Sequence, residues 1–442
     1  MSMKICFIPI DNRPVCYSLA KDIVAIDDAI ELYLPPRELL GGLKHNADVE
    51  NLFIWLKDCP KVDVVILSLD TIAYGGLIPS RRSVESFEQI KSRIEKLKTI
   101  LLEKDAKIFA FSSIMRISNN NYNEEEKEYW KEYGKKIFAY SFSGGKNNDG
   151  IPEEILQDYI STRKRNFEIN KIYLEWQKEG FFDTLIFSKD DCAEFGFNVD
   201  EANELEKLGG KIKTGADEIP LSLLSRAVEK KVKIYVEYSE PEFTDLISNY
   251  EDLSIKNSVL GQLELGGFEV VDSVENSDVV LYVNNFKEKQ GELVMGWDTE
   301  SFCGKFLAPA KPFCVADVRF ANGADNAFVE QLLPQINMQK FYGYSGWNTS
   351  ANTLGSLLAG VKIRFGAEKY NEASFRKLQI IRFLDDWAYQ ANVRGLISEP
   401  CDVKGLIKPY EDRIISVFGF ESSLDLKYSY PWDRKFEIEI VL

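Results

Sequence analysis

Two adjacent aspartates, Asp190 and Asp191, are the residues of this sequence best suited to chemistry. They follow the apolar run 184–188, which predicts a buried strand, so both carboxyl groups belong to the turn where that strand ends. Two close carboxylates repel each other, and one of them therefore keeps its proton to a higher pH. An acid beside an anion suits cleavage of a glycosidic bond. The structural alternative is that Asp191 caps the next helix while Asp190 pairs with Lys189 or an arginine.

Polar residues also follow most of the other predicted strands. The carboxyl ends of parallel strands meet at one edge of a sheet, where α/β proteins bind their ligands. We therefore predict that these residues bind a small sugar-like substrate, although residues such as Asp217 could instead cap helices. The predicted substrate-binding residues are Asp11, Asn12, Arg13, Asp70, Tyr74, Arg81, Arg116, Asp217, Glu218, Asp317, Asn322, Trp347, Asn348 and Asn352.

Some of these side chains have a specific expected role. Trp347 offers a flat apolar face to a sugar ring, and Asn348 offers an amide to its hydroxyl groups, although core packing is an equal alternative for the tryptophan. Tyr74 could donate its phenol near the reacting centre. The three arginines could bind an anionic group of the ligand or pair with the aspartates.

A rival hypothesis uses the aspartates as metal ligands. Asp11, Asp70, Asp190, Asp191 and Asp217 supply the oxygen ligands that Mg²⁺ or Mn²⁺ prefers, which predicts a metal-dependent hydrolase or transferase. The sequence has no glycine-rich phosphate-binding motif. A third hypothesis is a non-enzymatic protein that binds a small polar ligand. The favoured hypothesis, a glycoside hydrolase, requires neither metal nor cofactor.

The numbers of histidines and cysteines argue against several kinds of catalytic and metal site. His45 is the single histidine, which argues against Ser-His-Asp triads and histidine zinc sites. The seven cysteines are scattered and never spaced as Cys-x-x-Cys, which argues against a disulfide framework and a cysteine zinc site.

Strand and helix patterns alternate along most of the chain, which predicts an α/β fold with a parallel sheet. We favour a (β/α)₈-like barrel with a small α/β insertion at 231–312, and two doubly wound lobes are the alternative. The predicted domains are a catalytic domain at 1–365 and a helical region with a short β tail at 366–442. The strand candidates are residues 5–10, 30–34, 62–69, 107–112, 184–188, 211–214, 232–238, 279–283, 313–317 and 341–344. The main helix candidates are residues 85–103, 152–178, 199–208, 221–230, 372–394 and 403–417.

Charge and hydropathy exclude some partners. The chain has 442 residues and a formal net charge of −16, so its surface repels nucleic acid and acidic membranes. It contains neither an apolar run that could cross a bilayer nor the features of a signal peptide, and we expect a cytoplasmic protein. The sequence leaves the oligomeric state open.

Several motifs resemble a bacterial family known only as a domain of unknown function, over residues 4–365. They are Asp11-Asn-Arg-Pro, Tyr74-Gly-Gly-Leu-Ile-Pro-Ser-Arg81, Asp190-Asp191, Gly215-Ala-Asp-Glu218 and Gly346-Trp-Asn-Thr-x-x-Asn-Thr-Leu-Gly355. That resemblance implies no activity. Separately, the acidic pair resembles the site of barrel-type β-N-acetylhexosaminidases. This second resemblance implies that Asp190 is the general acid and Asp191 orients the acetamido group of the substrate, or the reverse.

Overall fold

The chain folds into two compact units that are interleaved in the sequence. The computed structural model describes residues 2–419 and 425–442, so residue 1 and residues 420–424 of the predicted domains lie outside the described residues. Unit 1 comprises Met1–Tyr17, Ile30–Pro220 and Tyr250–Asp252. Unit 2 comprises Ser18–Ala29, Leu221–Asn249 and Leu253–Leu442.

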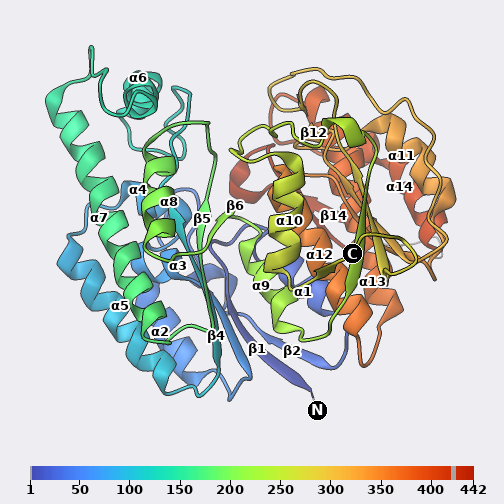
Figure 1. Cartoon of the computed structure of the whole chain (residues 1–442), viewed down its shortest axis with the longest axis horizontal. Coiled ribbons are helices and arrows are strands. Elements are labelled where there is room, and N and C mark those ends of the chain that lie inside the picture. The colour runs from blue at the N-terminus through green and yellow to red at the C-terminus, as the bar shows by residue number, and fades with distance from the viewer. Residues whose placement is uncertain (1, 420–424) are drawn as a thin grey trace. The chain divides into compact units, whose positions relative to one another are not determined.

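Unit 1 is built on a six-stranded parallel sheet with the order β2-β1-β3-β4-β5-β6 (Figure 1). The strands β3 and β5 are buried along their whole length, as expected for parallel strands that are covered on both faces. Their register places Leu67 beside Ala110, and Ala110 beside Leu185. The strands are β1 (Met3–Ile8), β2 (Ile30–Tyr33), β3 (Val64–Ser68), β4 (Lys107–Ile114), β5 (Thr184–Lys189) and β6 (Ile212–Thr214).

Helices pack on this sheet through apolar stripes. Helix α5 begins with a capping box formed by Ser86 and Gln89. Its residues Ile90, Ile94 and Leu97, spaced by four and three, are fully buried on one side, and the helix predicted at 85–103 is confirmed. Helix α7 contacts α5, β4 and β5 (Figure 1). The helices of unit 1 are η1 (Arg37–Leu39), α2 (Val49–Asp58), α3 (Leu69–Tyr74), α4 (Leu77–Arg82), α5 (Phe87–Leu102), α6 (Trp130–Phe142), α7 (Glu153–Lys178) and α8 (Phe197–Lys207).

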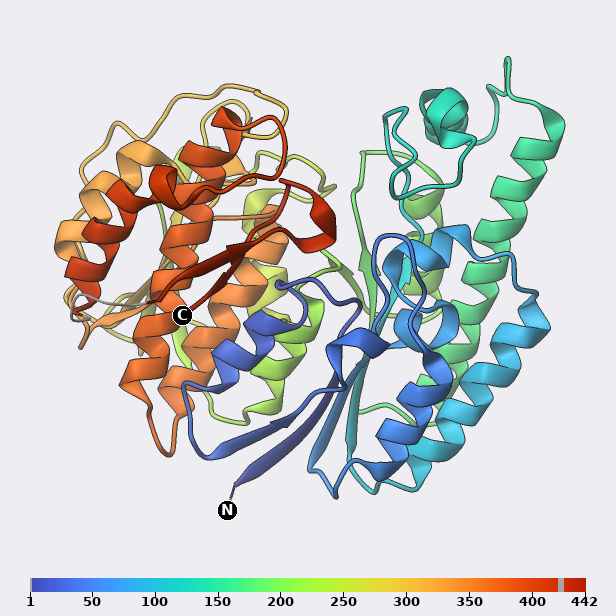
Figure 2. The same cartoon turned by 180° about the vertical axis from the view of Figure 1, so that it is seen from behind.

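Unit 2 contains a second parallel sheet, of five strands in the order β13-β11-β9-β7-β8. Unit 2 also has a short parallel pair, β10 and β12. An antiparallel pair near the C-terminus, β14 and β15, is drawn in dark red in Figure 2. The strands are β7 (Lys233–Tyr238), β8 (Glu269–Val270), β9 (Val279–Asn284), β10 (Gly291–Glu292), β11 (Phe313–Asp317), β12 (Phe320–Ala321), β13 (Phe341–Ser345), β14 (Lys427–Ser429) and β15 (Glu439–Val441).

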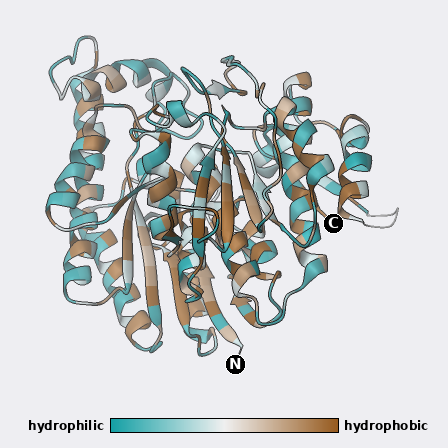
Figure 3. Cartoon of the chain, turned by 45° about the vertical axis from the view of Figure 1, so that its right-hand side comes forward, coloured by the Kyte–Doolittle hydropathy of each residue, from teal (hydrophilic) through white to brown (hydrophobic). Residues whose placement is uncertain are grey.

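One helix of unit 2 is central to its packing. Every residue of α12 from Ser350 to Arg364 is buried, because the helix lies among β11, β13, α10 and α1. Helices α13 and α14 bury only one face, and Figure 3 shows polar and apolar residues alternating along such helices. The helices of unit 2 are α1 (Ser18–Val24), most of α9 (Ile219–Ala227), η2 (Pro241–Phe243), α10 (Ile255–Leu265), α11 (Asn326–Leu332), η3 (Leu333–Gln335), α12 (Ser350–Gly366), α13 (Glu372–Arg382), the π-helix η4 (Phe383–Val393), η5 (Arg394–Leu396), α14 (Lys404–Phe418) and η6 (Pro431–Asp433).

The predicted fold class, α/β with parallel strands, is confirmed. The main strands are divided between two parallel sheets, which is the arrangement of the two-lobed alternative. Among the described residues, no helix combines the length and the apolar character needed to span a bilayer.

Candidate active site

The carboxyl ends of the strands in unit 1 carry most of the predicted site residues. Asp190 follows β5 directly, and Arg116 comes two residues after the end of β4. Asp70 lies in the first turn of α3, which begins where β3 ends. Asp11 and Asp217 each come three residues after the end of their strands, β1 and β6. Because the strands are parallel, these five side chains belong to the same edge of one sheet.

The paired aspartates share an arginine but differ in their contacts. Arg116 Nη1 donates a hydrogen bond of 2.9 Å to Asp191 Oδ2 and lies 3.6 Å from Asp190 Oδ2. Arg81 Nη2 is 3.9 Å from the same oxygen of Asp190. This oxygen is buried and accepts no hydrogen bond from the described residues. Asp191 has a φ angle of +26°, in the left-handed region that non-glycine residues rarely adopt.

Burial and mutual repulsion favour a protonated carboxyl in this pair. Burial is the main cause that raises the pKa of Asp190 to about 7, followed by the negative charge of Asp191, and Arg116 opposes both. Burial also raises the pKa of Asp191, against the lowering effect of Arg116. Because the two groups titrate together, the pair holds one proton more readily than two free carboxylates would.

The structural alternative for the pair is partly wrong. Helix α8 begins after Gly196, which caps it without a side chain, so Asp191 does not cap this helix. Lys189 forms its hydrogen bond with Asp252 rather than with Asp190. The predicted pairing with arginine is present, through Arg116. The two aspartates therefore form ion pairs with Arg116, and neither caps α8.

Glu126 connects the two arginines and was not predicted. Its Oε1 accepts hydrogen bonds from Arg81 Nη1 at 2.8 Å and from Arg116 Nε at 3.1 Å, and the residue is 5% exposed. Glu126 belongs to a run of asparagine and glutamate between β4 and α6, which resembles an ordinary solvated loop. Only the two arginines Arg81 and Arg116, which require anionic partners when buried, could have indicated its role.

A second ion-pair group lies at the ends of β1 and β6. Arg13 donates from Nε to Asp11 Oδ2 at 2.9 Å and from Nη2 to Asp217 Oδ1 at 2.5 Å. The carboxylate of Asp217 also contributes to the raised pKa of Asp190. The predicted gathering of acidic groups from β1, β5 and β6 is therefore present in unit 1.

Other predicted residues of unit 1 are buried or take part in hydrogen bonds with the backbone. Burial raises the pKa of Asp70 to about 7, and its Oδ2 accepts a hydrogen bond of 2.7 Å from the backbone of Ser113. Tyr74 is 2% exposed, and its hydroxyl has no hydrogen-bond partner among the described residues. Asn12 holds the β1 loop by a backbone bond to Gly41, and Glu218 is 1% exposed. A role for these residues in substrate binding stays a prediction.

The predicted site residues of unit 2 form their own network. Asp317 is fully buried and accepts hydrogen bonds from Asn284, Tyr344 and the backbone of Asp325, and its pKa is raised to about 8, mainly by burial. The backbone N–H of Asn322 donates to the carbonyl of Asn348, and both residues have positive φ angles.

The remaining two predicted residues of unit 2 lie close to this network. Asn352 donates from Nδ2 to Asn348 Oδ1 at 3.3 Å. Trp347 is 3% exposed and packs near Phe436, with 6.1 Å between the ring centroids. Its ring is therefore part of the packing of unit 2, which was the alternative for this residue, and its use as a sugar platform stays a prediction.

Most of the aspartates that could bind a metal ion are paired with arginines instead. No group of three or more His, Cys, Asp or Glu side chains in residues 2–419 and 425–442 is arranged to hold a metal ion. The aspartates at the strand ends face arginines, as Asp11 and Asp217 face Arg13. The metal-dependent reaction stays a prediction.

The fold and site define an α/β protein with parallel sheets and an arginine-bridged acidic pair at a strand end. The chain belongs to the family described as protein of unknown function (DUF4127), whose model matches residues 5–441. This confirms the resemblance to a domain of unknown function. No curated protein matches the chain.

A crystal structure of a bacterial fucosidase with an inhibitor is among the solved structures compared. It is 8% identical, the match covers 81% of this chain and 69% of that chain, and the TM-score is 0.19. A likeness at this TM-score carries no argument about the fold or the activity.

Proposed function

We propose that the chain is a glycoside hydrolase that acts on a small, N-acetylated amino-sugar substrate by acid catalysis. The observation that carries this proposal is the asymmetry of the pair at the end of β5. Asp191 accepts a hydrogen bond from Arg116, whereas Asp190 Oδ2 is buried and accepts none from the described residues. An ionised carboxylate is stabilised by such a donor, and a protonated one does not need it.

This asymmetry supports one role for each aspartate in the proposed reaction. Asp190 is the general acid: it donates its proton to the glycosidic oxygen as the bond between that oxygen and the anomeric carbon breaks. A group with a pKa of about 7 is still substantially protonated near neutral pH and gives up its proton readily. The acid is regenerated when it takes a proton from the water that enters in the second step.

Asp191 acts on the substrate's acetamido group in this proposal. The carbonyl oxygen of that group attacks the anomeric carbon, and the carboxylate of Asp191 accepts a hydrogen bond from the amide N–H as positive charge develops on it. The side chain of Asp191 is 34% exposed and that of Asp190 is 16% exposed. Asp191 is thus the more accessible of the two to a ligand.

The test is hydrolysis of nitrophenyl and umbelliferyl 2-acetamido glycosides by the full chain in the presence of EDTA. We expect the Asp190→Asn and Asp191→Asn variants to lose activity by about 10²–10⁴-fold, the usual contribution of a general acid or a charge-stabilising group. The matched control is Asp200→Asn, an exposed aspartate in the first turn of α8, which should keep the wild-type rate.

Two further comparisons separate the roles. Asp190→Asn should reduce the rate more for a poor leaving group than for dinitrophenol, because a good leaving group needs less protonation. Asp191→Asn should remove the preference for 2-acetamido over 2-hydroxy sugars. Full activity in both asparagine variants, or activity that EDTA abolishes and Mn²⁺ restores, contradicts the proposal.

A further inference from the structure

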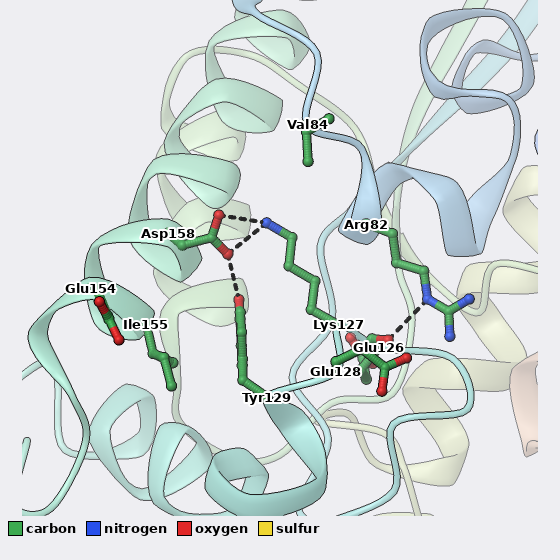
Figure 4. A pocket seen from close by; sticks show the side chains of 9 residues that line it. All are labelled: Arg82, Val84, Glu126, Lys127, Glu128, Tyr129, Glu154, Ile155 and Asp158. Carbon is green, nitrogen blue, oxygen red and sulfur yellow. Dashed lines mark hydrogen bonds and ion pairs between the residues drawn. The ribbon is translucent and has the colours of Figure 1, made fainter.

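Unit 1 contains an open pocket of about 540 Å³ that the proposed reaction does not use. It lies between the end of α4, the segment that leads into α6, and the first turns of α7 (Figure 4). A volume of this size accommodates a small organic ligand. The residues that line it are Arg82, Val84, Glu126, Lys127, Glu128, Tyr129, Glu154, Ile155 and Asp158.

Both cationic side chains of this pocket are already engaged by the protein. Lys127 Nζ donates to both carboxylate oxygens of Asp158, at 2.8 and 2.6 Å (Figure 4). Arg82 donates from Nε to the carbonyl of Glu126 at 2.9 Å and from Nη1 to the carbonyl of Leu43 at 3.0 Å. Neither cation is therefore placed to bind an anionic ligand.

The pocket carries an excess of negative charge at its rim. Its lining has four carboxylates against two cations, an excess of two negative charges. Glu126 is bound by arginines and Asp158 by Lys127 and Tyr129, so the excess negative charge falls on Glu128 and Glu154. Glu128 Oε2 also accepts a hydrogen bond of 2.6 Å from Asn123, a neutral donor that leaves its charge in place. Glu128 and Glu154 are exposed, and they come from different segments, the α6 leader and α7.

The lining also includes apolar side chains, beside the ion pair of Lys127 and Asp158. Val84 is 92% exposed, and a valine side chain left this open gains from contact with a hydrocarbon body. Ile155 and the ring of Tyr129 are half-buried and also line the pocket. An aromatic ring next to carboxylates favours an ammonium group further.

We propose that this pocket binds an aliphatic diamine, with one ammonium group against Glu128, the other against Glu154, and the methylene chain on Val84 and Ile155. Anions are disfavoured by the negative rim, and neutral polyols gain nothing from it. The proposal concerns binding alone and is independent of the proposed hydrolysis.

The test is calorimetric titration of the full chain with cadaverine, at low and at physiological salt. We expect saturable binding that weakens with added salt, and no binding of the neutral diol of the same length. The variant with both Glu128→Gln and Glu154→Gln should bind cadaverine about tenfold more weakly, since two partly exposed ion pairs are lost. Val84→Lys, which places a cation in the pocket, should weaken binding at least as much.

The matched control is Glu175→Gln, an exposed glutamate of the same helix α7, which should bind cadaverine like the wild type. All substituted side chains are exposed, so the variants should unfold at the wild-type temperature. Absence of binding to the wild type, equal affinity in the double glutamine variant, or equal binding of the diol overturns the proposal. A glycoside assay has no bearing on any of these outcomes.

Discussion

Replacing Asp70 with asparagine should change how the stability of unit 1 depends on pH. The pKa of Asp70 is raised by burial from 3.8 to about 7, so the folded state binds its proton more tightly than the unfolded state. The protonated carboxyl of Asp70 therefore stabilises the folded state. This stabilisation is complete below pH 3.8, the pKa of the group in the unfolded chain, and is lost as the pH rises through about 7. Between these two pKa values, each pH unit lowers the free energy of unfolding by about 1.36 kcal/mol. From about pH 5 to pH 8, the wild type should lose about 2.7 kcal/mol through this group alone.

The assay is hydrogen exchange of the β4 backbone, with β11 of unit 2 as the internal control. The amide of Ser113 in β4 donates to Asp70, and asparagine keeps an acceptor oxygen for this bond. The cost of the extra amide N–H₂ is the same at both pH values and cancels in the comparison. Relative to the wild type, Asp70→Asn should gain about 100-fold in β4 protection between about pH 5 and pH 8.

Equal changes of β4 protection in wild type and Asp70→Asn would refute this reasoning, because a group that titrates alike in both states cannot link stability to pH. A gain confined to β11 would also refute it. Protection of β11 should change alike in the two proteins, since Asp70 belongs to unit 1 and β11 to unit 2.

Three further outcomes are expected. Glycoside hydrolysis should show a bell-shaped pH profile whose alkaline limb falls near pH 7, because Asp190 must be protonated and Asp191 ionised; a rate that still rises above about pH 9 contradicts this assignment. Arg116→Met should move the acidic limb to higher pH, because the positive charge of Arg116 lowers the pKa of Asp191, and an unmoved limb contradicts the ion pair. Gly75→Ala should lower the unfolding free energy by about 1–3 kcal/mol in denaturant titration, because its φ is +91° and a Cβ meets neighbouring atoms, whereas Gly405→Ala, in the open first turn of α14, should raise it by about 0.5–1 kcal/mol.

Local sequence patterns predicted the six strands of unit 1, its helices α5, α7 and α8, and the position of its acidic pair, but not α2, α3 or α4. The apolar run before Asp190 is a buried strand, and the periodic residues of 85–103 form α5. These predictions succeeded because the alternation of polar and apolar residues reflects burial within a single element. The carboxyl ends of parallel strands lie at one edge of their sheet. Asp11 and Asp217 each follow such a strand end, and both pair with Arg13.

Burial that depends on distant partners could not be predicted in the same way. Glu126 lies in a run that looks solvated, yet it is buried because Arg81 and Arg116 come from other parts of the chain. Trp347 follows β13 as a strand-end residue, but its ring packs near Phe436, 89 positions later in the sequence. Neither contact leaves a periodic signal near the residue itself.

The early position of α1 in the sequence has a consequence for synthesis on the ribosome. Ser18–Val24 belongs to unit 2 and packs on α12 and α13, which end at Gly366 and Arg382. At about 5–20 residues per second, these partners emerge on the order of half a minute after α1. The apolar side of this short helix therefore has no packing partner during that interval. In contrast, β1 and β2, which precede and follow α1 in the sequence, can already pair with each other. Nascent chains of this protein should therefore be clients of a holding chaperone until translation is nearly complete.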